Sequence, residues 1–367
     1  MSPAPDNSAL DRYRGCILGL AAGDALGAPV EFMSWSAIRN IYGDTGIRDY
    51  AEGHYGRGRI TDDTQMTVAT AKGLLRASVG RGAAAGGTGT AADGTGTAVV
   101  TPAAPGSTVD LIYQSYLDWL RTQSDPAQRR GPGNTCLTAL GSGLMGTIEH
   151  PINDSKGCGG VMRVAPVGLA FPGRPVEAFE MGAASAAITH GHPGGYLPSG
   201  FLAALIARAL APENGPESAG SKDGSPTLLG LVTSMLAGTE GGSLDGTSAA
   251  LLRQAVELAK SNAAPRQALP ALGEGWTGDE ALAIAVYCAL RYPESLEEAV
   301  VAAVNHSGDS DSTGSITGAI VGAHLGAAAI PWRWLDVLEG REELEATAVR
   351  LYEAFGHGVT GAPGPTF

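Results

Sequence analysis

The chain is organised around a ten-residue polar stretch that sets two carboxylates among hydroxyls and glycines: Asn305-His306-Ser307-Gly308-Asp309-Ser310-Asp311-Ser312-Thr313-Gly314. Residues i and i+2 of a helix do not face each other, so these carboxylates can converge on one point only from a turn. A turn rich in carboxylates and hydroxyls suits a hard cation such as Mg²⁺. The alternative interpretation is a polar turn that caps a helix beginning near Ser315.

A second acidic cluster, Thr61-Asp62-Asp63-Thr64, lies far upstream. Thr61 is suited to cap a helix whose first turn holds both carboxylates, because the helix dipole favours anions there. Adjacent carboxylates also repel each other, and a cation between them would remove that cost. The sequence therefore supports a helix start and a metal site equally at this position.

Composition limits the classes of protein that the chain can belong to. It has 367 residues, of which 54 are glycine, and a formal net charge of −13 without any Lys/Arg-rich run. This charge argues against nonspecific binding of nucleic acid or of anionic membranes. A phosphorylated substrate remains compatible with it, because bound metal supplies positive charge locally.

Two low-complexity segments interrupt the chain at 80–109 and 212–226. Neither can bury enough specific apolar surface to order itself, so we expect both to be disordered insertions. The remaining residues are compatible with one large domain spanning 1–367.

The four cysteines form no CxxC pair, which favours reduced thiols in a cytoplasmic protein. The N-terminus lacks the pattern of a signal peptide, and no apolar run reaches the ~18 residues of a membrane span.

Helical periodicity dominates the sequence, and no period-two strand pattern occurs. We therefore predict an all-α fold, a compact bundle of ten or more helices. Ser295-Leu296-Glu297-Glu298 is read as a capping box that starts one of them. The other main predicted helices span 10–27, 108–122, 134–145, 177–191, 198–210, 228–237, 247–262, 279–291 and 315–330.

Three further features carry possible chemistry. The glycine-rich loop from Ser155 to Gly160 could offer backbone N–H groups to a phosphate, although a tight packing turn explains it as well. His190 lacks the additional ligands that a zinc site needs, which favours a substrate contact or a helix cap. Glu31 lies between Val30 and Phe32, and its position alone is typical of a surface charge.

The combination of these motifs resembles the ADP-ribosylglycohydrolase family. Its start is similar to Gly15-Cys16-Ile17-Leu18-Gly19-Leu20-Ala21-Ala22-Gly23-Asp24-Ala25-Leu26-Gly27 followed by Glu31. Its two metal motifs resemble Thr61-Asp62-Asp63-Thr64 and Gly308-Asp309-Ser310-Asp311-Ser312. Its substrate loops resemble Ser155 to Pro166 and Thr189-His190. The resemblance covers residues 10–330 with the motifs in the same order.

The resemblance implies a helical fold around a binuclear metal cleft that holds two Mg²⁺ ions, with Mn²⁺ as a substitute. The implied metal ligands are Thr61, Asp62, Asp63, Asp309, Asp311 and Ser312. Glu31 would lie beside the metals, and either Glu31 or Asp62 would act as the catalytic acid or base.

The implied substrate contacts fall on the glycine-rich loop and on two residues outside it. The loop residues Ser155, Lys156, Gly157, Cys158, Gly159 and Gly160 would hold the diphosphate and the distal ribose. His190 would lie near the adenosine or diphosphate portion. Two residues depart from the family pattern: Cys158 stands where several members have Asn, and Lys156 replaces an aromatic residue. Trp276 is therefore a candidate for the adenine platform.

The activity implied is Mg²⁺-dependent hydrolysis of the glycosidic bond between ADP-ribose and a modified acceptor, with release of ADP-ribose. Such bonds break through an oxocarbenium-like state, and a positioned carboxylate typically contributes about 10²–10⁴-fold to the rate. The expected partner is an ADP-ribosylated protein or another ADP-ribosyl conjugate. Two alternatives stay open: hydrolysis of a free ADP-ribose ester or other ribosyl conjugate, and a non-catalytic structural relative. The motifs leave the acceptor open among arginine, serine and nucleobase.

Overall fold

The computed structural model describes residues 7–85, 107–211, 227–238 and 244–356, and these residues form helices and no strand. This confirms the predicted all-α class. Gly157 and Thr277 form an isolated β-bridge. The α-helices are α1 (Asn7–Gly27), α2 (Trp35–Tyr42), α3 (Asp62–Ala85), α4 (Thr108–Thr122), α5 (Asn134–Gly141), α6 (Ala165–Ala170), α7 (Pro175–Ala187), α8 (Pro193–Ala209), α9 (Leu228–Leu236), α10 (Gly246–Lys260), α11 (Pro265–Leu272), α12 (Gly278–Arg291), α13 (Leu296–Val304), α14 (Ser310–Leu325), α15 (Trp332–Leu335) and α16 (Arg341–Phe355).

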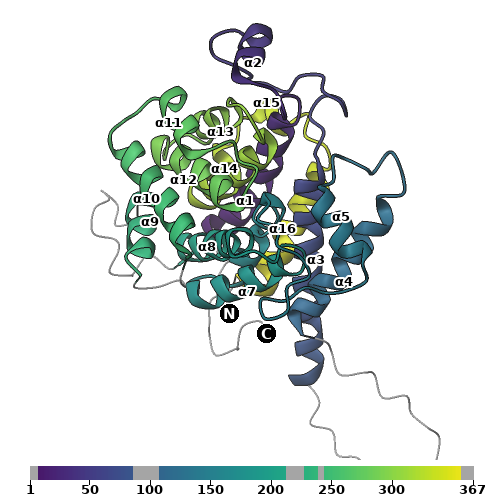
Figure 1. Ribbon diagram of the computed structural model, residues 1–367. Coiled ribbons are helices and arrows are strands. Elements are labelled where there is room, and N and C mark those ends of the chain that lie inside the picture. Colours follow the sequence, from purple (N-terminus) through teal and green to yellow (C-terminus); the bar gives the residue numbers. More distant parts are fainter. Residues whose placement is uncertain (1–6, 86–106, 212–226, 239–243, 357–367) are drawn as a thin grey trace, which may run out of the picture.

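Helices α1 and α14 form the centre of the bundle and pack against each other through glycines (Figure 1). A Cβ atom on Gly19 would lie 2.5 Å from the carbonyl oxygen of Gly318, and one on Gly23 would lie 2.0 Å from that of Gly314. Only residues without a Cβ allow two backbones this close. The close approach places the C-terminal end of α1 beside the N-terminal end of α14.

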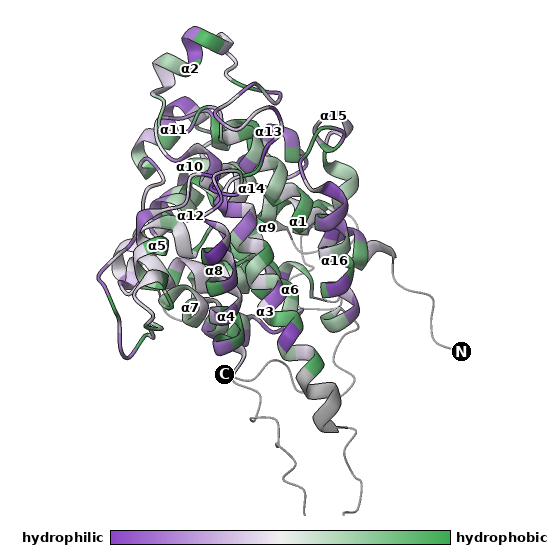
Figure 2. Ribbon diagram, turned by 90° about the vertical axis from the view of Figure 1, so that its right-hand side faces the viewer, coloured by the Kyte–Doolittle hydropathy of each residue, from purple (hydrophilic) through white to green (hydrophobic). Residues whose placement is uncertain are grey.

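The remaining helices surround this pair (Figure 1). Helices α9 to α13 lie on one side, α3 to α5 on the other, and α7 and α8 lie below in this view, while α2 projects from the opposite end. Apolar and polar residues alternate along the packed helices, as the mixed purple and green ribbons of Figure 2 show, and many of the apolar residues are buried. A large core includes Tyr13, Tyr116, Phe171 and Trp334, and a smaller cluster around Tyr287 joins α10 to α13.

Several predicted helix boundaries were wrong, and proline and glycine explain part of the error. Helix α8 begins at Pro193, five residues before the predicted start, because proline is well accommodated in the first turn of a helix. The helix predicted over 134–145 ends at Gly141, and Gly143 then takes a positive φ of 75°.

The predicted capping box at Ser295 is only half formed. The Ser295 hydroxyl accepts the backbone N–H of Glu298 at 3.2 Å, but the Glu298 side chain pairs with Arg48 instead of returning to Ser295. The reciprocal box occurs at the start of α4, where Ser107 and Asp110 each accept the other's backbone N–H.

The low-complexity ranges lie largely outside the described residues. Helix α3 continues to Ala85 and α4 begins at Thr108, so both ends of the range 80–109 are helical, contrary to the expected disorder there. Residues 86–106 and the whole of 212–226 fall outside the described part. None of the described helices is both long and apolar enough to cross a lipid bilayer.

Candidate active site

The predicted carboxylates come together where three helix ends meet. Asp62 and Asp63 occupy the first turn of α3, Asp309 caps α14, and Asp311 lies in the first turn of α14. Glu31 follows α1 in a turn whose backbone amide donates to the carbonyl of Gly27 at 3.0 Å. Two of these helices thus present their N-terminal, positively polarised ends to the cluster, which favours negative charge there.

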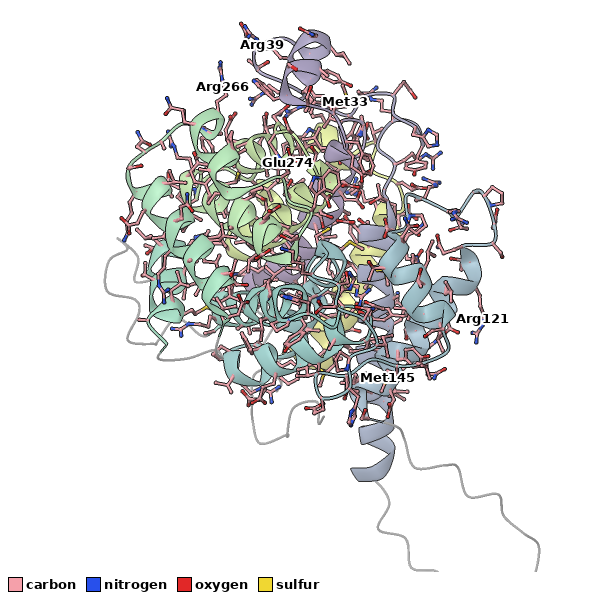
Figure 3. The ribbon with its side chains drawn as sticks, viewed as in Figure 1. Met33, Arg39, Arg121, Met145, Arg266 and Glu274 are labelled. Atoms are coloured by element: carbon pink, nitrogen blue, oxygen red, sulfur yellow. The ribbon has the colours of Figure 1, made fainter. Side chains whose placement is uncertain are left out.

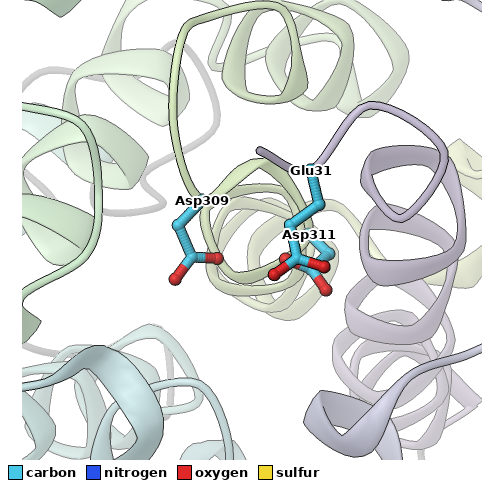
Figure 4. A group of neighbouring side chains, drawn as sticks. All are labelled: Glu31, Asp309 and Asp311. Carbon is cyan, nitrogen blue, oxygen red and sulfur yellow. The ribbon is translucent and has the colours of Figure 1, made fainter. Parts of the chain in front are cut away.

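Glu31, Asp309 and Asp311 form the tightest acidic group. Each contributes a carboxylate oxygen, and these oxygens all lie within 4.8 Å of one another. In Figure 4, Glu31 and Asp311 lie beside each other and Asp309 faces them. Burial, followed by the charges of Asp309 and Asp62, raises the pKa of Glu31 to about 9. The sequence predicted a surface charge from position alone, whereas the structure places Glu31 inside the cluster.

The residue after Glu31 holds the turn in place. Phe32 adopts a φ of 63°, a left-handed conformation that is unusual for a bulky residue, and its amide donates to the carbonyl of Gly308 at 3.2 Å. Strained residues of this kind persist where the surrounding structure fixes them and cluster at functional sites. The turn after α1 is therefore tied directly to the stretch that carries Asp309.

Asp62 and Asp63 lie on the opposite wall and are buried. Burial and the neighbouring carboxylates raise the pKa of both groups well above the ordinary range. The Asp63 Oδ1 atom lies 3.5 Å from the Ser312 hydroxyl, which connects the α3 cluster to the α14 cluster. The Asp63 Oδ2 atom is buried and makes no hydrogen bond to the described residues. A buried carboxylate oxygen without a partner costs free energy, and a cation would supply that partner.

Helix α14 begins at Ser310, five residues before the predicted start, so the expectation that both carboxylates lie on a turn before the helix was wrong for Asp311. Asp309 accepts the N–H of Ser312 at 3.3 Å, and Asp311 is 4% exposed in the first helical turn. The helix cap and the convergent carboxylates had been posed as alternatives. Both are present, because a cap residue and a first-turn residue can face the same space beyond a helix end.

Asp24 lies in the glycine-rich motif at the start of the chain, and the sequence predicted no role for it. It is fully buried in α1, and its carboxylate accepts the amide of Thr61 at 3.0 Å and the hydroxyl of Thr61 at 2.8 Å. It also accepts the amide and the hydroxyl of Thr64. Asp24 therefore fixes the turn that presents Asp62 and Asp63. The available signal was an aspartate inside the second half of α1, which is otherwise made of apolar residues and glycines.

The glycine-rich loop borders the acidic cluster through Cys158. The Cys158 thiol lies 2.9 Å from Asp309 Oδ2 and 3.7 Å from the Ser312 hydroxyl. The Cys158 amide donates to the carbonyl of Trp276 at 3.1 Å, and the Gly157 amide donates to the Ser155 hydroxyl at 3.3 Å. Two amides that were expected to be bare are therefore already used within the protein.

His190 and Arg163 lie beneath this loop. His190 is 2% exposed, and a Cβ atom on Gly159 would lie 2.9 Å from its ring. Burial and the nearby Arg163 cation lower the pKa of His190 to about 3, so its ring is neutral. Arg163 is 1% exposed and donates to the Thr189 hydroxyl at 2.7 Å, and among the described residues it forms no ion pair. A buried, unpaired guanidinium thus makes the region under the loop electropositive.

Trp276 lies at the rim of the cluster. Its ring stacks on Phe32 with centroids 5.2 Å apart, and its indole N–H donates to Glu274 at 3.0 Å. The amide of Asp309 donates to the carbonyl of Glu274 at 2.8 Å, so this turn is tied to the acidic stretch. Lys156, which belongs to the glycine-rich loop from Ser155 to Gly160, is exposed.

A cavity of about 220 Å³ opens on the outer side of the stretch, lined among others by Trp35, Arg266, Glu274 and His306. Figure 3 labels Arg266 and Glu274 at this end of the molecule, together with Met33.

Comparisons with known proteins agree with this arrangement. A family model described as ADP-ribosylglycohydrolase matches residues 5–359. An uncharacterized protein of Archaeoglobus fulgidus is 30% identical over 94% of this chain and 96% of its own. The ADP-ribosyl-dinitrogen reductase glycohydrolase of Rhodospirillum rubrum is 28% identical over 91% and 92%, and ADP-ribosylhydrolase ARH3 of Mus musculus is 26% identical over 94% and 92%.

A solved structure described as an ADP-ribosylglycohydrolase-related protein complex superimposes with a TM-score of 0.65 at 28% identity, covering 94% of this chain and 98% of the other. The helical fold, the buried carboxylate cluster and these matches together define a hydrolase of ADP-ribosyl bonds. The chain belongs to the ADP-ribosylglycohydrolase family.

Proposed function

We propose that this enzyme hydrolyses, with Mg²⁺, the glycosidic bond between ADP-ribose and a modified acceptor and releases ADP-ribose. The observation that carries the proposal is the convergence of Glu31, Asp309 and Asp311 beside the glycine-rich loop. The carboxylates provide a place for the reacting ribose, and the loop provides an adjacent place for the diphosphate.

The donor set fits hard divalent cations. Carboxylate and hydroxyl oxygens are the ligands that Mg²⁺ prefers. Burial and the charges of neighbouring carboxylates raise the pKa of Asp63 and of Asp311 well above the ordinary range, and a cation among them would offset that repulsion. The buried Asp63 Oδ2 atom also lacks a protein partner. The residues that would hold two ions are Thr61, Asp62, Asp63, Asp309, Asp311 and Ser312.

Bound ions would orient the ribose hydroxyls and make a nearby water more acidic. The proton transfer is assigned to side chains of the protein. Glu31 lies within the cluster and can take a proton from that water or give one to the leaving group. Asp62, on the facing wall, is the second candidate for this role. The electropositive region around Arg163 favours the diphosphate on the loop above it.

The experiment is a substrate panel with Mg²⁺ in the buffer. Arginine-, serine- and nucleobase-linked ADP-ribose and a free ADP-ribose ester are each incubated with the enzyme, and released ADP-ribose is quantified by chromatography. Asp311→Asn should lower the release by ~10²-fold or more, because it removes a carboxylate from the cluster. Asp118→Asn, at an exposed ion pair with Arg76 and Arg121, is the matched control. If no conjugate yields ADP-ribose with Mg²⁺ or Mn²⁺, the proposal is wrong.

A further inference from the structure

We propose that Arg163 is a positioning residue for substrate binding: through the Thr189 hydroxyl it fixes His190 so that the ring carries its proton on Nε2 and presents this N–H to the glycine-rich loop. The inference rests on the proposed function, because it takes the loop as the place of the substrate's diphosphate. It gives a role to a buried arginine and names the ring atom that would contact the substrate.

Two hydrogen bonds meet at the Thr189 hydroxyl. Arg163 Nη2 lies 2.7 Å from Thr189 Oγ1, and His190 Nδ1 lies 2.8 Å from the same oxygen. A guanidinium has donors only, so the hydroxyl accepts from Arg163. Thr189 is fully buried, and its hydroxyl hydrogen has no other acceptor among the described residues than His190 Nδ1. The hydroxyl therefore donates to Nδ1, which leaves the ring proton on Nε2.

The arginine also keeps the histidine ring uncharged. Arg163 forms no ion pair with the described residues, and its guanidinium lies over the Tyr116 ring, 4.2 Å from the centroid. Burial, followed by the charge of Arg163, lowers the pKa of His190 to about 3. A neutral imidazole has one N–H, so His190 has a single donor, at Nε2.

The Nε2 atom faces the glycine-rich loop. A Cβ atom on Gly157 would lie 3.4 Å from His190 Nε2, and one on Gly159 would lie 3.1 Å from it. Because both residues lack a side chain, the ring lies directly against the loop. Among the described residues Nε2 has no hydrogen-bond partner, whereas Nδ1 has Thr189. A buried N–H without an acceptor costs free energy, and an oxygen of the substrate would supply the acceptor.

The loop itself has few amides left for a diphosphate. The Ser155 amide donates to Asn153 Oδ1 at 3.0 Å, and the Gly157 amide donates to the Ser155 hydroxyl at 3.3 Å. The Cys158 amide is also bonded within the protein. His190 Nε2 therefore supplies, from a separate segment of the chain, a donor that these backbone groups do not provide.

The backbone around His190 is held independently of the Thr189 hydroxyl. Asn153 Nδ2 donates to the carbonyl of Thr189 at 2.8 Å, and Asn153 Oδ1 accepts the amide of Gly191 at 3.1 Å. Removing the hydroxyl alone should therefore leave the segment in place and release only the ring. Thr189→Val does this, because valine keeps the branched shape of threonine and lacks the hydroxyl.

The first test reads the ring proton directly. The full-length protein is labelled with ¹⁵N in its seven histidines, and NMR distinguishes the protonated from the unprotonated nitrogen of each neutral ring. The His190 signals are identified by their loss in His190→Gln. We expect the proton on Nε2 in the wild type, and we expect ADP-ribose to shift the Nε2 resonance. In Thr189→Val the Nδ1 resonance should lose the shift that its hydrogen bond with the hydroxyl causes.

The second test measures the affinity for ADP-ribose and for Mg²⁺ by calorimetry. Thr189→Val should weaken ADP-ribose binding ~10-fold or more, because a donor to a charged group is no longer held in place, and Mg²⁺ affinity should stay unchanged. Thr189→Ser, which keeps the hydroxyl, should bind ADP-ribose as the wild type does. Thr347→Val is the matched control, because Thr347 is a buried threonine of α16 whose hydroxyl also accepts from an arginine, Arg350, at 3.5 Å.

A double-mutant cycle tests Arg163 itself. Arg163→Met removes the donor that commits the Thr189 hydroxyl to His190, and it should also weaken ADP-ribose binding. Thr189→Val should then weaken binding less in the Arg163→Met background than in the wild type, because residues of one hydrogen-bonded chain do not act additively. Equal effects in both backgrounds would show that Arg163 does not act through Thr189, and they would overturn the inference.

Two readings need the wild type alone, so they hold even if a variant fails to fold. A proton on Nδ1 of His190 overturns the inference, because the ring then donates to Thr189 and offers no N–H to the loop. Bound ADP-ribose that leaves the Nε2 resonance unchanged overturns it as well. If hydrolysis and ADP-ribose binding persist in either case, the proposed function stands without it. If ADP-ribose does not bind and no conjugate is hydrolysed, the proposed function fails, and the inference fails with it.

Discussion

The carboxylate of Asp24 accepts both the backbone amide and the hydroxyl of Thr61, at 3.0 Å and 2.8 Å. This pair joins the last turn of α1 to the start of α3. Because α1 also packs on α14 through facing glycines, one buried aspartate sets the position of the α3 carboxylates relative to those of α14.

Replacing Asp24 with asparagine tests this positioning role. Asn keeps one acceptor oxygen but loses the charge that two amides and two hydroxyls now contact. We expect Mg²⁺ affinity to fall by ~10- to 100-fold, the range typical of residues that orient metal ligands. Calorimetric titration measures this, with Asp118→Asn as the surface control. Unchanged affinity in Asp24→Asn would show that the Thr61 turn holds its shape without the charge.

The cluster also predicts how stability depends on pH in the absence of metal. Burial raises the pKa of Asp24 to about 6 and that of Glu31 to about 9, from ordinary values of 3.8 and 4.5. A carboxyl whose pKa is raised in the folded state binds its proton more tightly there. Its contribution to stability is present below the ordinary pKa and is lost as pH rises through the raised value. The chelated protein should therefore lose stability between pH 7 and 9.

This pH range avoids an opposing group. Burial lowers the pKa of His190 to about 3, so its contribution is complete above its ordinary value of 6.5 and is lost only as pH falls below it. Melting temperatures at pH 7, 8 and 9 with chelator should fall, and Mg²⁺ should flatten the trend because ionised carboxylates are the ligands. A chelated protein whose melting temperature rises over this range would contradict the assignment of the cluster as buried and uncompensated.

The packing of α1 on α14 gives a prediction about stability alone. A Cβ atom on Gly318 would lie 1.9 Å from the carbonyl oxygen of Gly19, and a backbone atom cannot move aside cheaply. Gly318→Ala should therefore lower the free energy of unfolding by about 2 kcal/mol or more. Gly141→Ala is the matched control in α5, because nothing lies within 4 Å of its added Cβ, and alanine should raise helix stability by up to ~1 kcal/mol. Urea denaturation compares the two, and equal effects would argue against the close contact.

The sequence predicted the features that depend on residues close together along the chain. It did not predict the features that depend on contacts between residues far apart in the chain. The helical class followed from apolar periodicity, and both acidic clusters were visible as unusual groups of carboxylates. The partial burial of Glu31 could not be predicted from the sequence. It arises because the turn after α1 packs against the stretch around Asp309. The role of Asp24 likewise depends on threonines that are distant in sequence.

Helix boundaries show the same limit. The start of α14 was placed too late because its first turn is made of polar residues, which look like a loop to any apolar period. These polar side chains belong to the carboxylate cluster. The first turn of α14 therefore lacks the apolar periodicity by which a helix is recognised in a sequence. Helix α16 was not predicted, although it covers α1 and α3 and its Tyr352 ring packs edge-on against Tyr13.

Glu31→Gln separates three roles for the residue nearest the expected chemistry. If Glu31 transfers a proton, kcat should fall by about 10²–10⁴-fold. Binding of ADP-ribose should persist, because the loop and the other carboxylates are unchanged. If Glu31 instead positions metal, Mg²⁺ affinity should fall together with the rate, since its oxygen lies within 4.8 Å of those of Asp309 and Asp311. A surface charge would change kcat less than about twofold, in the manner of exposed residues distant from a site.

Three measurements on this one variant distinguish the roles: kcat on an ADP-ribosyl conjugate, Mg²⁺ affinity and ADP-ribose affinity by calorimetry. Glu52→Gln is a suitable control, because Glu52 is an exposed carboxylate of the loop that follows. We expect the first pattern, a large loss of kcat with both affinities retained, because six other residues are the proposed metal ligands and Glu31 is the carboxylate of the cluster that remains to transfer a proton. Retained turnover in Glu31→Gln would instead transfer the acid–base role to Asp62, the second candidate for it, which is buried in the first turn of α3.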